Sequence, residues 1–156
     1  MEKKDIPSFR TVLDRVCRER KYLAFVEAPA LPEVRRYVLD HIAKKDVQIV
    51  AARGNEIVGW CDIIRLELPG FGHAGRLGMG LAGKFRGIGI GSNLVKEALR
   101  LARERGLRRI ELEVFASNPK AIRLYERFGF SMEGRKVRAR YLDERFDDVV
   151  LMGLLL

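Results

Sequence analysis

Apolar residues recur along this chain with two periods, and the change from one period to the other predicts its helices and strands. Two early stretches, Phe9–Cys17 and Pro32–Ala43, repeat apolar residues every three or four positions, as one face of a helix does. Ser8 stands where the first helix needs an N-cap. Gln48–Ala52 and Ile57–Arg65 are apolar runs around a polar turn that contains a glycine, so we expect a β-hairpin there.

The second half continues with strands and helices in alternation. The expected elements are, in chain order, a strand at His73–Leu81, a helix at Ile90–Arg105, a strand at Arg109–Phe115, a helix from Asn118 to about Phe128, and two strands at Ser131–Tyr141 and Phe146–Leu155. Gly78 and Gly80 interrupt the first of these strands, where we expect a bulge or the close approach of a ligand. This order predicts one α/β (α+β) domain over residues 1–156, built on a mixed sheet flanked by helices.

A glycine-rich stretch, Leu77–Ser92, joins the expected strand to the longest expected helix. It contains six glycines and two cations, Lys84 and Arg86. Glycine lets a backbone approach a ligand closely, and the first turn of a helix offers N–H groups that have no partner within the helix. These features predict a phosphate or pyrophosphate site at the start of the helix. Its candidate residues are Lys84, Arg86, Gly87, Gly89, Gly91 and Ser92.

A dinucleotide fingerprint, a P-loop and a turn without a ligand all agree less well with this stretch. Gly78-x-Gly80-x-x-Gly83 matches the dinucleotide fingerprint in its letters, but Lys84–Gly87 follows where that motif must already open a helix. A P-loop needs Gly-Lys followed by Ser or Thr, and the chain has no such string. A turn that binds nothing rarely needs this many glycines.

Two motifs resemble one protein family. Arg86-x-x-Gly89-x-Gly91 resembles the pyrophosphate loop of the GNAT superfamily, the acetyl-CoA-dependent N-acetyltransferases. Leu112–Phe130, which contains Leu-Glu-Val-Phe-Ala-Ser-Asn-Pro, resembles the second half of the same cofactor site, particularly in ribosomal-protein acetyltransferases of the Rim type and their relatives. The resemblance covers about residues 48–156. It implies a GNAT-like fold, with a central, mixed, mostly antiparallel twisted sheet, although the usual first strand is not evident.

The resemblance also implies how acetyl-CoA is held. Pantetheine is expected along His73–Leu81, almost like another strand, with a backbone N–H near Leu81 polarising the thioester carbonyl. Asn118 would cap its helix and form a hydrogen bond with pantetheine, and Tyr125 would contact the same cofactor. Lys120 and Arg123 would meet the 3′-phosphate, although exposed cations on a helix are common.

Transfer of an acetyl group to an amine needs a polarised carbonyl, a neutral amine and a stabilised thiolate. The resemblance makes Tyr125 the proton or hydrogen-bond donor to the thiolate, whereas the pattern alone is also compatible with a packed aromatic residue. It makes Glu113 the candidate base. A glutamate with a pKa near its ordinary value of about 4.3 is a poor base for an ammonium ion, so Glu113 would need burial or a water relay, or would simply bind the cationic acceptor. Glu111, Asp62 and His73 are rivals for the base.

Composition narrows the class of protein further. Hydrophobic residues make up 47% and charged residues 33%, which is typical of a globular domain. Two cysteines without a secretion signal favour reduced thiols in the cytoplasm, and both lie in apolar patterns. The two histidines make no metal-binding spacing with them, so we expect no metal, and no apolar run is long enough to span a membrane.

The formal net charge of +9 suits attraction of a polyanionic cofactor, an acidic ribosomal surface or a nucleic acid. The arginines are spread through the elements, which favours solvated faces and cofactor steering, and the chain lacks the interleaved aromatics of an RNA-binding surface. The hypothesis is an N-acetyltransferase that works by direct transfer in a ternary complex, with a protein N-terminus or a small amine as acceptor. A non-catalytic acyl-CoA-binding sensor, or a ribosome- or RNA-associated module, is the alternative. A homodimer through the final strands is compatible with the family.

Overall fold

The computed structural model describes all 156 residues, and its centre is one six-stranded sheet. The strands are β1 (Val47–Arg53), β2 (Glu56–Arg65), β3 (Ala74–Leu81), β4 (Arg109–Phe115), β5 (Ser131–Leu142) and β6 (Arg145–Leu155). They lie in the order β1-β2-β3-β4-β6-β5, and every neighbouring pair is antiparallel except β3 and β4. The predicted mixed, mostly antiparallel sheet is therefore confirmed.

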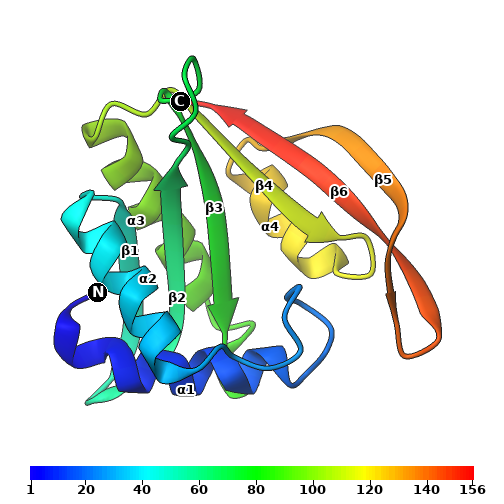
Figure 1. Cartoon of the computed structure of the whole chain (residues 1–156). Helices are drawn as coiled ribbons and strands as arrows, with labels where there is room; N and C mark the ends of the chain where they lie inside the picture. Colours follow the sequence, from blue (N-terminus) through cyan, green and yellow to red (C-terminus); the bar gives the residue numbers. More distant parts are fainter.

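Four helices cover the two faces of this sheet (Figure 1). They are α1 (Ile6–Cys17), α2 (Leu31–Ala43), α3 (Ile90–Glu104) and α4 (Pro119–Arg127), and short 3₁₀ turns stand at Lys3–Asp5 and Gly83–Phe85. Helices α3 and α4 share one apolar core with the sheet, whereas α1 and α2 share a second core with β2 and the end of β3. Each helix therefore buries its apolar stripe on the sheet, as its period predicts.

The start of α1 differs from the expectation. The helix begins at Ile6, with Pro7 in its first turn, so Ser8 is not its N-cap. The Ser8 hydroxyl instead accepts a hydrogen bond from the backbone N–H of Ile57 on β2, at 2.8 Å. Proline suits the first turn because its missing N–H would have no partner there, and this signal outweighs the capping preference of serine.

The two glycines of β3 also have a different role from the expected bulge. The pairing of β2 with β3 runs without a register shift from Gly59–Leu81 to Arg65–Gly75. A Cβ at Gly78 would lie 2.7 Å from Asp62 Oδ1, and one at Gly80 would lie 2.1 Å from the ring of Trp60. Glycine is needed here because side chains of β2 lie over the backbone of β3.

The parallel pair β3 and β4 is joined only at its start. Its register covers three pairs, Ala74–Arg109, Gly75–Ile110 and Arg76–Glu111, after which the two strands diverge. Figure 1 shows the resulting V-shaped separation in the middle of the sheet, open towards the carboxyl ends of both strands. Beyond these three pairs, the facing edges of β3 and β4 are left free to pair with a ligand.

Candidate active site

The glycine-rich loop and the N-terminus of α3 stand at the open end of this separation, directly after β3. Gly87 and Gly89 have φ of +81° and +92°, a conformation that favours glycine, and a Cβ at either would meet nothing within 4 Å. No side chain caps α3. Its first N–H groups, at Ile90, Gly91 and Ser92, are therefore free to bind an anion. Free N–H groups at a helix start are what a phosphate or pyrophosphate site needs, so the pyrophosphate site at this loop stays a prediction.

The side chain of Arg86 is turned away from this anion site. Its Nε donates to the carbonyl oxygen of Leu81 at 2.7 Å, and its two terminal nitrogens donate to the carboxylate of Glu19 at 2.6 and 2.7 Å. The guanidinium also lies 4.4 Å from the centre of the Tyr22 ring. Each of the three guanidinium nitrogens donates one hydrogen bond, so the side chain of Arg86 fastens the segment between α1 and α2 to the end of β3, and only the backbone of Arg86 belongs to the loop. Lys84 is exposed and lies over the ring of Phe85.

Helix α4 brings two further candidates to the same region. The Asn118 side chain accepts a hydrogen bond from the backbone N–H of Ala121 at 3.2 Å, so its predicted capping role is confirmed. Tyr125, two turns along, is buried with its ring edge against Phe130. Burial raises the pKa of Tyr125 well above its ordinary value. The phenol therefore stays protonated and is a hydrogen-bond donor. Lys120 and Arg123 are exposed on the same helix.

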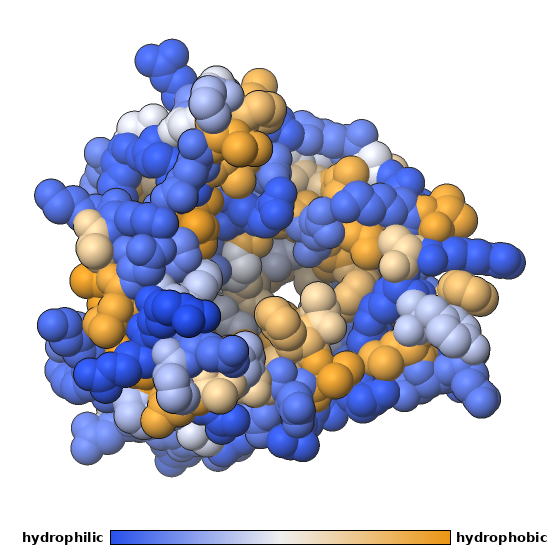
Figure 2. Space-filling model, in the orientation of Figure 1, coloured by the Kyte–Doolittle hydropathy of each residue, from blue (hydrophilic) through white to orange (hydrophobic).

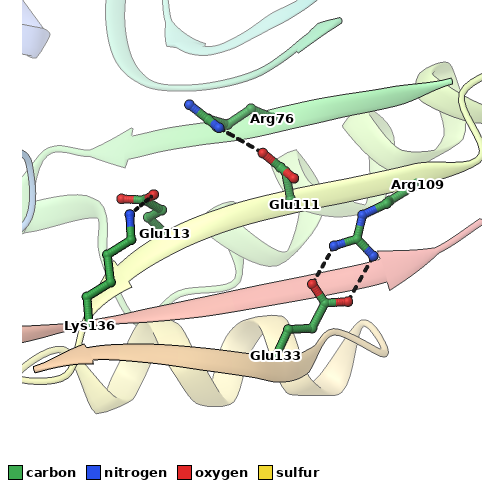
Figure 3. A network of polar contacts seen from close by, with 6 residues as sticks. All are labelled: Arg76, Arg109, Glu111, Glu113, Glu133 and Lys136. Atoms are coloured by element: carbon green, nitrogen blue, oxygen red, sulfur yellow. Dashed lines mark hydrogen bonds and ion pairs between the residues drawn. The ribbon is translucent and has the colours of Figure 1, made fainter. Parts of the chain in front are cut away.

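On the opposite face of the sheet, Glu111 and Glu113 belong to a set of ion pairs (Figure 3). Arg76 Nη2 lies 2.8 Å from Glu111 Oε1, and Lys136 Nζ lies 2.8 Å from Glu113 Oε1. Figure 3 shows the Glu113 carboxylate where β3 and β4 move apart, while the pair between Arg109 and Glu133 lies further back along the strands. Glu113 is thus placed at the separation and stays the nearer candidate of the two glutamates.

These ion pairs line a small cavity that is open to solvent. Its volume is about 380 Å³, within the range of small-molecule sites. It is lined by Arg76, Glu111, Leu112, Glu113, Glu133, Lys136, Leu151 and Met152. Figure 2, in the orientation of Figure 1, shows a hollow in the middle of the molecule with apolar surface along part of its rim. A polar, charge-alternating cavity therefore adjoins the separation on the face opposite to α3 and α4.

The other rivals are placed differently. His73 precedes β3, and its carbonyl accepts from the backbone N–H groups of Arg108 and Arg109, at the closed end of the separation. Asp62 is buried on β2 beneath Tyr37, whose hydroxyl donates to Asp62 Oδ2 at 2.9 Å. Burial raises the pKa of Asp62 to about 6, and the Tyr37 hydrogen bond opposes this rise.

Sequence reasoning missed three residues that shape the region, Glu19, Tyr22 and Tyr37. Glu19 and Tyr22 lie in an irregular segment, and their partner Arg86 is more than sixty residues away in the chain, so no periodic pattern connects them. Tyr37 interrupts the polar face of α2, and this is the one signal that could have been found. The structure contains no group of three or more metal-ligating side chains, and none of its helices is both long and apolar enough to cross a bilayer.

Comparison with known proteins gives a consistent result. The model of the acetyltransferase (GNAT) family matches residues 15–130. The L-amino acid N-acetyltransferase AaaT of Escherichia coli is 29% identical over 138 residues, covering 79% of this chain and 85% of the relative. The crystal structure of a GNAT-family acetyltransferase from Streptococcus pneumoniae superposes with a TM-score of 0.92 at 28% identity, covering 100% of this chain and 96% of that one.

A third similar protein is a phosphinothricin acetyltransferase from Sinorhizobium meliloti, solved in complex with acetyl-CoA. It superposes with a TM-score of 0.89 at 18% identity, covering 100% of this chain and 85% of that one. At this identity the likeness concerns the fold.

Proposed function

The chain belongs to the acetyltransferase (GNAT) family, and from that premise we propose that it acetylates the α-amino group of a free amino acid or an amino-acid-like compound. It is an acyl-CoA-dependent N-acetyltransferase with acetyl-CoA as cosubstrate. The acceptor is the new element of the proposal. The single observation that carries it is the cavity beside the separation of β3 and β4, where cations and carboxylates alternate.

An α-amino acid has an ammonium and a carboxylate a few ångströms apart, and the cavity offers partners for both. Glu113 can hold the ammonium, while Arg76 or Lys136 can hold the carboxylate. The existing ion pairs are about half exposed, and pairs of that kind contribute only ~0–1 kcal/mol. A zwitterionic acceptor can therefore exchange partners with them at little cost. The similarity to an L-amino acid N-acetyltransferase over 79% of the chain supports the same class.

The proposed roles follow from where each group lies. The first-turn N–H groups of α3 hold the pyrophosphate, and Asn118 and the free edge of β3 near Leu81 hold pantetheine. The bound thioester supplies the acetyl group. Tyr125 donates a hydrogen bond to the sulfur as it becomes a thiolate. This is the more defensible role, because a phenol with its pKa raised gives up its proton less readily than a thiol.

The acceptor amine must lose a proton before it attacks. An α-amino group has an ordinary pKa of about 8 and a lysine amine one of about 10.4, so the α-amino acceptor makes the smaller demand on any base in the site. Glu113 is proposed to bind and orient the ammonium at the mouth of the separation. Direct transfer in a ternary complex then needs no covalent enzyme intermediate.

The test is release of CoA thiol from acetyl-CoA across a panel of acceptors. The panel contains free L-amino acids, amino-acid-like herbicides, short peptides with varied N-termini, polyamines and aminoglycosides. We expect release with free amino acids and loss of release when their α-carboxylate is amidated. Release with peptides alone would overturn the acceptor class but leave the acetyltransferase intact. Tight acetyl-CoA binding without release for any acceptor would favour the non-catalytic sensor.

A further inference from the structure

A buried polar cluster lies on the cavity side of the sheet, beneath α2, and none of the roles above uses it. Asp62 and Gln48 are each only 7% exposed. Tyr37 on α2 donates its hydroxyl hydrogen bond to Asp62 Oδ2, which leaves Asp62 Oδ1 without a side-chain partner. Both polar side-chain atoms of Gln48 are buried and have no hydrogen-bond partner. Unpaired polar groups at such depth are costly and call for a function.

The register of the sheet connects this cluster to the separation of β3 and β4. Gln48 pairs with Asp62, and Asp62 pairs with Gly78. Gly78 is two residues beyond Arg76, and Glu113 is two residues beyond Glu111, the partner of Arg76. Gly78 and Glu113 therefore face each other where the strands have parted.

Gln48, Asp62, Gly78 and Glu113 thus form one row across the sheet. Side chains two residues apart along a strand share one face, so the carboxylates of Asp62 and Glu113 lie on the same side of the sheet. Between Asp62 and Glu113 the row contains only Gly78, which has no side chain. Position 78 favours glycine, because a Cβ there would lie 2.7 Å from Asp62 Oδ1. The Oδ1 oxygen of Asp62 thus lies over bare backbone at the edge of the separation.

We propose that Asp62 is the second carboxylate of the acceptor site and receives the proton that the acceptor ammonium must lose. This inference rests on the proposed function, because it assigns a role within the same ternary complex. Glu113 holds the ammonium, and Asp62 Oδ1 takes one proton from it, leaving a neutral amine and a neutral carboxyl. When the amide forms, the nitrogen loses a second proton, which the departing CoA thiolate takes up to give the thiol. After transfer, Asp62 returns the proton to solvent. Gln48, beside it on β1, offers its amide oxygen to the protonated carboxyl.

The electrostatic surroundings of Asp62 suit this role. Tyr37 and His41 on α2 are the titratable groups that face it, and His41 is itself within 2.8 Å of Asp46. Gln48 on β1 has no charge, and Arg76 is turned towards Glu111. Backbone hydrogen bonds from Asp62 itself and from Gly78 on β3 lower the pKa of the Asp62 carboxyl. Burial is the largest influence and raises the pKa of Asp62 to about 6. That value lies about 2 units below an ordinary α-amino group, against about 4 for an unperturbed glutamate.

The experiment compares Asp62→Asn, Glu113→Gln and Asp46→Asn with the unaltered protein, using the best acceptor from the panel. Thiol release by the unaltered protein decides the proposed function, and the variants then decide this inference. We expect kcat/KM of the unaltered protein to fall as pH drops through about 6, since protonated Asp62 cannot accept a proton. Asp62→Asn should lose this acid limb and lower kcat about 10²-fold or more, with an unchanged Kd for acetyl-CoA.

Asp46→Asn is the matched control, because Asp46 is a buried carboxylate of the same neighbourhood. It lies 2.8 Å from His41 Nδ1 and accepts a hydrogen bond from the backbone N–H of Arg65. Asp46→Asn should retain the fall of kcat/KM at low pH. If Asp62→Asn does not fold, Tyr37→Phe tests the same proposal. Loss of its hydrogen bond raises the pKa of Asp62, so the acid limb should move to higher pH. An unchanged limb in Tyr37→Phe, or a limb lost in Glu113→Gln and kept in Asp62→Asn, would overturn the proposal.

Discussion

Among single residues, Tyr125 has the clearest division between binding and chemistry. Its ring packs in the core between the sheet and α3. Tyr125→Phe keeps the packing and removes only the hydroxyl, which we propose donates a hydrogen bond to the leaving sulfur. We expect kcat to fall about 10²-fold while the Kd of acetyl-CoA, measured by calorimetry, stays within a factor of two or three. Equal kcat in the variant would remove Tyr125 from the mechanism.

The raised pKa of Tyr125 adds a pH signature to the same experiment. Because burial favours the neutral phenol, the group keeps its proton well above pH 10. Ionisation of Tyr125 should therefore not lower kcat of the unaltered protein between pH 8 and 10. Any decline of kcat in this range should also remain in Tyr125→Phe. Such a decline would mean that the phenol ionises within the working range.

Residue roles were predictable from the sequence only where the backbone itself demands a residue type. Gly87 and Gly89 were singled out because glycine lets a backbone approach a ligand closely, and the structure adds that both have positive φ. Asn118 was singled out because a helix start needs an acceptor. The side chain of Arg86 was assigned to the anion site, yet it binds Glu19. A partner so distant in the chain depends on tertiary packing, which leaves no local pattern to read.

Among the elements, the segment after α1 is the one that the sequence described least. It has no helix or strand between α1 and α2, and it is held by Arg86 to the end of β3 and by Arg20 to Asp143 in the β5–β6 turn. The segment therefore connects the open end of the separation between β3 and β4 with the β5–β6 hairpin. The regular elements were predicted within a few residues, because their periods are strong, whereas this segment has none.

The ion pair between Glu19 and Arg86 should position that segment for the acceptor. It is bidentate and only about 30% exposed, a geometry that makes such pairs stronger than ordinary surface pairs. We expect Glu19→Gln to raise the KM for the acceptor several-fold, with a smaller change in the KM for acetyl-CoA, because the glycine loop keeps its backbone conformation. Steady-state kinetics with both substrates measures the difference.

Glu97→Gln is the matched control for this prediction. Glu97 also pairs with an arginine, Arg100, but both lie exposed on the outer face of α3. Its kinetic constants should match those of the unaltered protein. If Glu19→Gln behaves in the same way as Glu97→Gln, the pair has no positioning role.

Asn118 offers a test of whether one residue both caps α4 and binds the cofactor. Asn118→Ala should lower the free energy of unfolding by about 1 kcal/mol and weaken acetyl-CoA binding. Asn118→Asp keeps the oxygen that accepts from Ala121, so it should restore stability. It lacks the amide donor, so the affinity for acetyl-CoA should stay low. Urea unfolding and calorimetry separate the two effects, and full recovery of affinity in Asn118→Asp would leave only the cap.

At the scale of the whole molecule, we expect the charge of +9 to attract a cosubstrate that has several phosphate charges. The sign of this field was predictable from composition. Which cations meet the cosubstrate was not, because that depends on the fold, which carries Lys120 and Arg123 exposed on α4. A field of this kind accelerates encounter and is screened as the Debye length falls from about 10 Å at 0.1 M salt to about 3 Å at 1 M.

We therefore expect the KM for acetyl-CoA to rise several-fold between 0.05 and 0.5 M NaCl, while kcat changes little, because the buried Tyr125 is poorly screened. Acetyl-dephospho-CoA, which lacks the 3′-phosphate, should have a weaker salt dependence. If Lys120 and Arg123 meet that phosphate, the double variant Lys120→Gln/Arg123→Gln should reduce the salt dependence for acetyl-CoA to the level of the dephospho compound and leave the latter unaffected. A KM that is independent of salt would show that the positive charge serves something other than capture of the cosubstrate.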